Sequence, residues 1–238
     1  MKTLLLFDID GTILYLKMYR SKYFFNKIFR EMFDTEIPVE KMPNFAGMTD
    51  LKIIEDICLI GDLPLDKVLL RTHEIWERLL QEFQANVSPD DIELTPNISK
   101  ALRFAHENPD FSLALVTGNF EANAYFKLRL FDFDKYFPVG AFGSDHANRD
   151  LLPNLAIQRA NALFGSDFSP ENSVVIGDSP SDILCAKASG ALSVGVATGH
   201  HSSEDLAKFS PDLLFENLSS YEDCFTKILD IINHRHHQ

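Results

Sequence analysis

Cysteine is scarce in this sequence, which contains three in 238 residues, at Cys58, Cys185 and Cys224. Cysteines so far apart match neither a disulfide framework nor the Cys-x-x-Cys pairs of a zinc site. The sequence also shows no internal repeat and no low-complexity tract. We therefore expect a folded protein of a reducing compartment, and we assign it to the cytoplasm.

Long apolar runs are missing too, since none approaches the about 18 residues that a membrane-spanning helix needs. The N-terminal apolar segment lacks the small-residue cleavage site of a signal peptide. Basic residues are in the minority, because 22 Lys and Arg stand against 35 Asp and Glu and give a net charge of -13. A duplex nucleic-acid binder needs a basic face, so we expect neither a nucleic acid nor a membrane as a partner.

The sequence does contain short apolar runs that each end in Asp, Thr or Gly, at residues 3–7, 111–116, 173–176 and 191–196. Continuous apolarity of this length is typical of strands buried on both faces of a parallel sheet. Helical spacing of apolar residues lies between and after them, at residues 98–105, 155–163 and 225–232. The alternation predicts a doubly wound, Rossmann-like α/β fold, in which ligands bind at the carboxyl ends of the strands.

Residues 15–91 have a different pattern, with no convincing strand. Apolar residues recur there at helical spacing around residues 23–29, 51–58 and 68–80. A helical block inserted after the first strand predicts a second, smaller domain over the carboxyl edge of the sheet. We expect a core of residues 1–14 and 92–238 and an all-helical domain of residues 15–91.

The strongest chemical signal is the segment Asp8-Ile9-Asp10-Gly11-Thr12, directly after the first apolar run. Two carboxylates two residues apart repel each other if they are buried together, unless a cation or a shared proton compensates. Taken alone, the segment is also compatible with a strand that runs into an Asp-Gly turn. Its meaning therefore depends on which residues end the other strands.

Two later runs also end in polar residues. Thr117-Gly118-Asn119 follows the second run, and Gly177-Asp178-Ser179-Pro180-Ser181-Asp182 follows the third. Taken singly, Thr117 is explained by helix capping, and Asp178 and Asp182 by turns and caps. Together with Asp8 and Asp10, however, the pattern resembles the haloacid dehalogenase superfamily in its phosphatase branch. The inserted helices resemble the helical-cap group, which includes phosphoglycolate-phosphatase-like enzymes and β-phosphoglucomutase.

The resemblance implies specific roles for the acidic residues. Asp8 would be the nucleophile that forms an aspartyl-phosphate, and Asp10 the general acid and base. Mg²⁺ would be held by the Asp8 carboxylate, the Asp10 backbone carbonyl and Asp178. Asp182 would be a further ligand or would hold a metal-bound water. The phosphate group would be bound by the Thr117 hydroxyl, by backbone N–H groups of Asp10, Gly11 and Gly118, and by Asn119.

One departure from the superfamily pattern concerns a lysine that normally precedes a proline-containing turn and contacts both nucleophile and phosphate. The corresponding residues 144–153 contain no lysine, and Arg149 is the expected substitute because its planar fork suits phosphate oxygens. Lys127 is the alternative. Its place two turns into the helix after Thr117 instead predicts a side chain that faces solvent or packs its stem.

The inserted helices should determine specificity. Residues 45–50 resemble the loop that this group of proteins lowers over the site, although Thr49 or Asp50 can equally be the N-cap of the next helix. Lys17, Arg20 and Lys22 are candidates to bind a substrate carboxylate or a second phosphate, and solvent-facing positions on a helix are the alternative for all three.

We therefore predict a Mg²⁺-dependent phosphatase that hydrolyses a small phosphorylated metabolite through an aspartyl-phosphate. A phosphomutase, which would return the phosphoryl group to a sugar, and a catalytically inactive binding module of the same fold remain open. Asp10 argues against a halide-releasing dehalogenase, because the resemblance implies that those enzymes lack the second aspartate. The sequence does not distinguish a monomer from a dimer.

Overall fold

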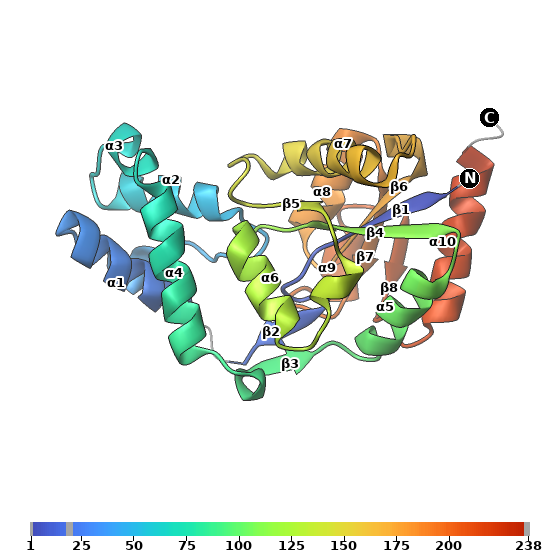
Figure 1. Cartoon of the computed structure of the whole chain (residues 1–238), viewed down its shortest axis with the longest axis horizontal. Coiled ribbons are helices and arrows are strands. Elements are labelled where there is room, and N and C mark those ends of the chain that lie inside the picture. The colour runs from blue at the N-terminus through green and yellow to red at the C-terminus, as the bar shows by residue number, and fades with distance from the viewer. Residues whose placement is uncertain (1, 18–20, 236–238) are drawn as a thin grey trace.

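The computed structural model describes residues 2–17 and 21–235, and within them the core is a six-stranded parallel sheet (Figure 1). Its strand order is β5-β4-β1-β6-β7-β8. These strands span Thr3–Phe7 (β1), Phe111–Val116 (β4), Gly140–Ala141 (β5), Ser173–Gly177 (β6), Leu192–Val196 (β7) and Leu213–Phe215 (β8). The central strand β1 is paired on both sides, with Leu5 opposite Leu113 of β4 and Val174 of β6.

Helices cover both faces of this sheet. They are α5 (Ile98–Glu107), α6 (Glu121–Arg129), α7 (Leu152–Phe164), α8 (Pro180–Ser189), α9 (Ser203–Ala207) and α10 (Tyr221–Arg235). Successive residues of β1 point to opposite faces. Leu5 and Phe7 share a buried cluster with α5 and α10, whereas Leu4 and Leu6 share another with α7 and α8. The predicted doubly wound α/β fold is therefore confirmed.

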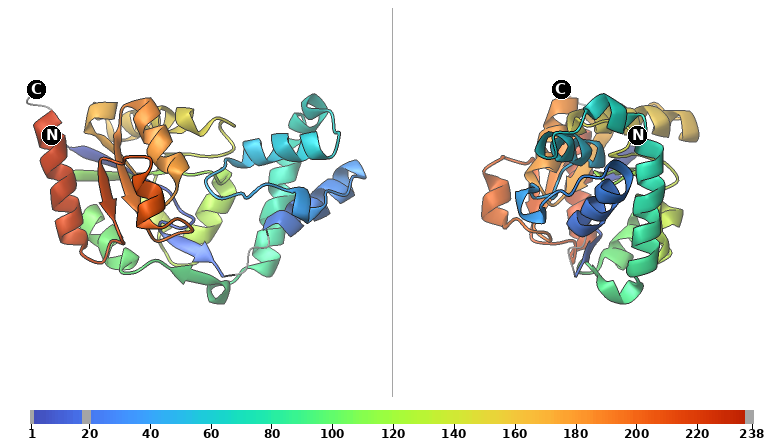
Figure 2. Two further views of the ribbon diagram at one scale, coloured as in Figure 1. Left: turned by 180° about the vertical axis from the view of Figure 1, so that it is seen from behind. Right: turned by 90° about the vertical axis from the view of Figure 1, so that its left-hand side faces the viewer.

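The remaining helices form a block at the carboxyl end of the sheet, opposite the two chain termini (Figures 1 and 2). They span Ser21–Phe33 (α1), Asp50–Ile60 (α2), Leu65–Leu69 (α3) and Thr72–Asn86 (α4). A two-stranded antiparallel ribbon connects the block to the sheet, with β2 (Leu14–Leu16) paired to β3 (Ile92–Leu94). The chain thus enters and leaves the block side by side.

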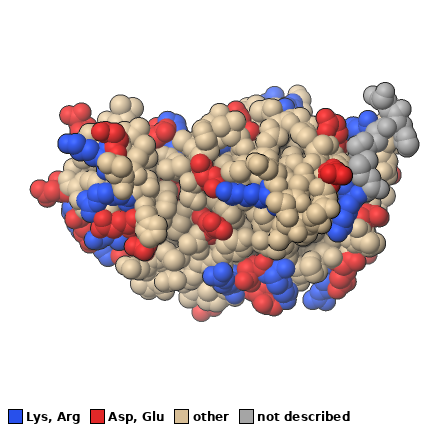
Figure 3. All heavy atoms as spheres, turned by 45° about the horizontal axis from the view of Figure 1, so that its top comes forward, with Lys and Arg blue, Asp and Glu red and all other residues tan. Residues whose placement is uncertain are grey.

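Short 3-10 helices complete the chain, at Val39–Lys41, Pro89–Asp91, Asp134–Tyr136, Arg149–Leu151 and Pro170–Asn172. The described helices include none that is long and apolar enough to cross a membrane. On the face shown in Figure 3, acidic and basic side chains lie close to one another at both ends of the molecule.

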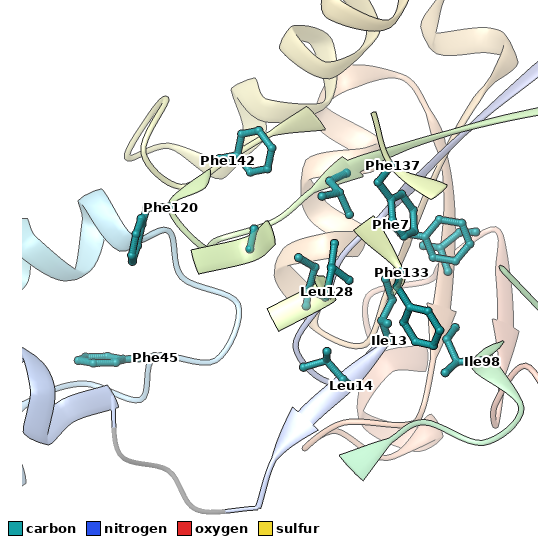
Figure 4. Close-up of a cluster of buried hydrophobic side chains, with 14 of the residues drawn as sticks. Phe7, Ile13, Leu14, Phe45, Ile98, Phe120, Leu128, Phe133, Phe137 and Phe142 are labelled. Atoms are coloured by element: carbon teal, nitrogen blue, oxygen red, sulfur yellow. The ribbon is translucent and has the colours of Figure 1, made fainter. Parts of the chain in front are cut away.

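Phenylalanine side chains fill both the core and the contact with the helical block. Phe7 packs edge to face against Phe137, with ring centroids 5.7 Å apart, in the cluster shown in Figure 4. At the boundary, Trp76 of α4 stacks on Phe120 at 5.1 Å and 11°. Such aromatic pairs contribute more than the apolar area they bury, so this contact helps to hold α4 against the core.

Two details of the sequence-based description of the inserted block are wrong. Tyr15 and Leu16 belong to strand β2, although no strand was expected there, because β2 is stabilised by pairing with β3 at the far end of the block. The helix expected around residues 68–80 is two helices, α3 and α4, and the break lies at Leu70, which is 87% exposed. The apolar periodicity of a segment contains no information about the strand that pairs with it or about the exposure of its individual residues.

Candidate active site

The segment that follows β1 has a conformation that depends on its sequence. The N–H of Asp8 donates to the Ile176 carbonyl at 3.0 Å, so that Asp8 still lies in the sheet with its side chain buried. Gly11 then takes φ +88, and a Cβ atom there would lie 2.2 Å from the Asp178 carboxylate. Only glycine allows both the turn and this close approach, while Thr12 donates its hydroxyl to Asp178 at 3.1 Å.

The segment after β6 brings two more carboxylates to the same place. Asp182 lies in the first turn of α8, where one oxygen accepts from the Ser179 N–H at 3.1 Å and from its hydroxyl at 2.6 Å. This capping box keeps one Asp182 oxygen on the helix N-terminus. The other oxygen, Oδ1, accepts from the Arg149 guanidinium at 2.5 Å.

Asp8, Asp178 and Asp182 form one buried cluster, with a carboxylate oxygen from each lying within 4.8 Å of the other two. Burial raises the pKa of Asp8 to about 7, and the neighbouring carboxylates of Asp182 and Asp10 add to this effect. Burial likewise raises the pKa of Asp178 well above its usual range. Carboxylate oxygens gathered at such a distance fit a hard divalent cation such as Mg²⁺, whose charge would offset their repulsion.

Arg149 brings a positive charge into this cluster. The side chain is 7% exposed, and one guanidinium nitrogen lies 3.2 Å from Asp8 Oδ1 and 2.5 Å from Asp182 Oδ1. Although burial opposes its charge, the carboxylates of Asp182 and Asp8 raise the pKa of Arg149 above its usual value. Arg149 therefore occupies a position from which it can contact both the expected nucleophile and a phosphate bound there.

Lys127 does not face solvent, so the first of the two positions expected for its side chain is wrong. Its side chain on α6 is buried, and Nζ lies 2.7 Å from both carboxylate oxygens of Asp10 and 2.8 Å from Asn119 Oδ1. The ring of Phe83, from α4, covers it at 5.6 Å. Asn123 and Lys127 lie on one face of α6, but Asn119 precedes the helix, so helical spacing alone does not predict its contact with Lys127.

Asn119 connects Asp10 to Thr117. Its Nδ2 donates to Asp10 at 2.6 Å and to the Thr117 hydroxyl oxygen at 2.9 Å. Thr117 is fully buried and is not the helix cap, since Phe120 is the N-cap of α6. The strand end at Thr117 and the segment after β1 therefore present their polar groups to the same space.

The loop of residues 45–50 lies against this space. Thr49 is the N-cap of α2, where its oxygen accepts from the Lys52 N–H, and it also donates to the Ala147 carbonyl at 2.7 Å. The Asp50 N–H donates to the Gly118 carbonyl at 2.8 Å. A Cβ atom at Gly118 would lie 1.9 Å from the Met48 carbonyl, so glycine permits the loop to close on the core.

Asp50 contributes a further buried carboxyl at this contact. Its Oδ2 accepts from the Phe120 N–H at 2.7 Å. Burial raises the pKa of Asp50 to about 7, although the hydrogen bond from Phe120 and the charge of Lys127 oppose the shift. The carboxyl end of the sheet and the helical block together enclose a cavity of about 660 Å³.

The other expected residues lie in different places. Lys17 lines the cavity, and its Nζ donates to the Asp90 carbonyl, whereas Lys22 donates to the Met42 carbonyl. Arg20 lies outside the described residues. The N–H of Gly11, expected to donate to phosphate, donates instead to the Leu14 carbonyl at 2.7 Å.

Comparisons with known proteins show which family the chain resembles. Residues 2–190 match the family described as haloacid dehalogenase-like hydrolase. The phosphoglycolate phosphatase of Salmonella paratyphi A is 28% identical over 162 residues, which are 67% of this chain and 63% of that protein. The phosphoglycolate phosphatase of Escherichia coli K12 is 26% identical over 158 residues, 66% of this chain and 60% of that protein. The chain thus spans less than two thirds of these curated relatives.

Solved structures share the whole architecture. A β-phosphoglucomutase from Clostridium difficile superposes with a TM-score of 0.70 at 18% identity and covers 100% of both chains. A protein from Haemophilus somnus, described as a predicted phosphoglycolate phosphatase, superposes with a TM-score of 0.68 at 19% identity, over 94% of this chain and 98% of that one. At these identities, the likeness shows the fold alone.

Proposed function

Because the chain belongs to the haloacid dehalogenase-like hydrolases, we propose that it is a Mg²⁺-dependent phosphatase of a small phosphorylated metabolite, acting through an aspartyl-phosphate. The observation that carries this proposal is the buried cluster of Asp8, Asp178 and Asp182. Asp10 and Arg149 lie beside the cluster, at the floor of one cavity. The similarity to curated proteins named phosphoglycolate phosphatases supports a phosphatase.

Asp8 is the proposed nucleophile. A carboxylate oxygen of Asp8 would form a bond to phosphorus while the ester P–O bond breaks and its electron pair leaves with the alcohol oxygen. Water would then attack the aspartyl-phosphate, release inorganic phosphate and restore the Asp8 carboxylate. Mg²⁺ held by Asp8, Asp178 and the Asp10 carbonyl, with Asp182 close by, would supply charge stabilisation for the transferring phosphoryl group.

Asp10 is the proposed general acid and base. It would give a proton to the departing alcohol oxygen and later take one from the attacking water. Lys127 and Asn119 hold its two oxygens at 2.6 to 2.7 Å, so they fix the direction of this proton transfer. A group held in a productive geometry lowers the barrier because no reorientation is needed in the transition state.

Arg149 and Thr117 are the proposed contacts of the phosphate oxygens. Arg149 already lies 3.2 Å from Asp8, and a guanidinium at that position can contact an oxygen of the group that Asp8 attacks. Thr117 is fully buried at the end of β4, with its hydroxyl facing Asn119. Both are in place before substrate arrives, which favours the charged transition state.

We assign residues 15–91 to a mobile cap and residues 1–14 and 92–238 to the catalytic core. Loop residues 45–50 touch the core through the Asp50–Gly118 hydrogen bond, whereas the β2–β3 ribbon connects the two parts covalently. Opening would break the loop contacts and let product leave, with the ribbon near Leu14 and Asp91 acting as the hinge.

A Mg²⁺ titration with a panel of phosphomonoesters tests the proposed function. We expect release of inorganic phosphate that requires Mg²⁺ and stops with a chelator. Acid-quenched single turnovers should contain a peptide with residue 8 that is heavier by one phosphoryl group. Conversion of a sugar 1-phosphate to its isomer without phosphate release would identify a phosphomutase instead, and absence of both Mg²⁺ binding and turnover would indicate an inactive binding module.

Replacing Lys127 with methionine is expected to lower kcat for an alkyl phosphate about 10- to 100-fold. The variant removes the cation that orients Asp10 and keeps the apolar stem. For 4-nitrophenyl phosphate we expect a smaller loss, because a good leaving group needs little help from a general acid. Arg129→Met is the matched control, since Arg129 lies on the same helix with a 67% exposed side chain. Equal losses for both substrates would contradict the positioning role.

A further inference from the structure

The part of the cavity formed by the helical block contains an apolar wall beside the polar side chains of Ser21, Asn44 and Asp50. Its lining there includes Leu16, Phe25, Phe45, Ile53, Leu79 and Phe83. Phe25 and Phe45 pack edge to face at 5.5 Å, and Phe83 packs against Phe24 at 5.2 Å. Because these rings pack against other rings, they present a preformed apolar wall to whatever occupies the cavity.

The cavity is large for a very small metabolite. Its volume of about 660 Å³ lies within the range of about 300–1,000 Å³ that is typical of sites for drug-sized ligands. A phosphorylated two-carbon acid bound at Asp8 would leave much of the cavity beside the apolar wall unfilled. Covering that wall with an apolar group of the substrate would instead contribute to binding.

The charges in the cavity do not favour a second anionic group at this wall. Among residues 2–17 and 21–235, the lysines and arginines that line it are Lys17, Lys127 and Arg149, and His200 lines it as well. Lys127 is ion-paired with Asp10, and Arg149 with Asp8 and Asp182, whereas Lys17 donates to the neutral Asp90 carbonyl at an exposed position. Asp50 adds a carboxyl on the side of the helical block, and a buried anion without a partner is costly.

We infer that the leaving alcohol of the substrate is uncharged and presents an aromatic ring or another apolar face to Phe25, Phe45 and Phe83. This inference rests on the proposed phosphatase function. It separates the protein from the relatives named after phosphoglycolate, whose alcohol is a short anion. Hydrolysis adds one water across the P–O bond and releases the uncharged alcohol and inorganic phosphate.

The first test compares kcat/KM of the Mg²⁺-loaded full chain on three alkyl phosphates: 2-phenylethyl phosphate, glycerol 1-phosphate and phosphoglycolate. We expect 2-phenylethyl phosphate to exceed glycerol 1-phosphate about 10- to 100-fold, the factor for burying one phenyl group, and phosphoglycolate to be the poorest. Glycerol 1-phosphate separates the effect of the apolar face from the effect of lacking a charge. A preference for phosphoglycolate would overturn the inference and leave the phosphatase proposal intact.

A matched pair of variants tests the wall itself. Phe25 and Phe29 are both buried on α1, one turn apart, but only Phe25 lines the cavity. Phe25→Leu is expected to lower kcat/KM for 2-phenylethyl phosphate about 2- to 10-fold, and by more than it lowers kcat/KM for glycerol 1-phosphate. Phe29→Leu should affect neither, with thermal unfolding showing that both variants fold. Equal effects of the two variants would contradict the assignment of the wall.

Binding of phosphonates makes the test independent of turnover. Calorimetric titration should show tighter binding of 3-phenylpropylphosphonate than of 3-phosphonopropionate, which mimic the aromatic and the anionic ester. If the protein shows this preference but hydrolyses no ester, the phosphatase proposal is wrong and the proposed ligand class stands. Equal binding, or tighter binding of 3-phosphonopropionate, would overturn the ligand class whatever the turnover shows.

Discussion

Replacing Asp8 with asparagine is expected to lower kcat for phosphate release at least about 10⁴-fold, because the amide cannot form the aspartyl-phosphate. The geometry favours this substitution as a test: an asparagine oxygen can still accept from Arg149, which lies 3.2 Å from Asp8 Oδ1. Phosphate release from an alkyl phosphate with saturating Mg²⁺ is the measurement. A variant that keeps a tenth of the activity would show that Asp8 is not the nucleophile.

The stability of the same variant provides the control for folding. Burial raises the pKa of Asp8 from 3.8 to about 7, so the folded state holds a proton that the unfolded state loses between these values. The contribution of the Asp8 carboxyl to the stability of the metal-free protein should therefore fall as pH rises from about 4 to 7. Asp8→Asn lacks this loss, and with chelator at pH 8 it should unfold at a higher temperature than wild type, by about 2–4 °C per kcal/mol. The difference should vanish near pH 4.

Replacing Arg149 with methionine is expected to lower kcat/KM about 10²- to 10³-fold, comparable to the loss of one charge-stabilising group in other active sites. The variant also leaves Asp8 and Asp182 without the guanidinium that both contact. Loss of one partner of a buried ion pair costs about 3–5 kcal/mol. Saturating Mg²⁺ should restore part of the lost thermal stability, since a bound cation compensates the same carboxylates.

Two comparisons interpret that result. Arg149→Lys should recover more activity than Arg149→Met, because an ammonium keeps the charge but loses the planar fork. Arg159→Met is the matched control: Arg159 of α7 forms a two-point ion pair with Asp145 at 2.7 Å, and neither residue lines the cavity. The Arg159→Met variant should lose stability and keep its activity. If Arg149→Met keeps wild-type activity, Arg149 does not replace the missing lysine.

Much of the sheet could be predicted because its signals are local. The runs at residues 3–7 and 111–116 coincide with β1 and β4, since continuous apolarity over five or six residues is a property of the segment itself. The edge strands β5 and β8 were not predicted, because they are two and three residues long. Their strand conformation depends on pairing with β4 and β7.

The candidate site likewise has a part that local signals predicted and a part that depends on contacts between distant segments. The motifs placed Asp8, Thr117 and Asp178 at strand ends, and the parallel topology explains why these ends meet. The direction of Lys127 could not be read from α6 alone, because α6 shows little amphipathic bias and the side chain is buried by Phe83 from α4.

The α/β core and the order in which acidic and polar residues follow its strands could be read from the amino-acid sequence, because both depend on neighbours in the chain. The pairing of Lys127 with Asp10, the contact of Arg149 with Asp8, and the aromatic rings of the helical block that line the cavity became visible in the folded chain. Burial and ion pairing depend on segments that are distant in sequence, and these meet only when the chain has folded.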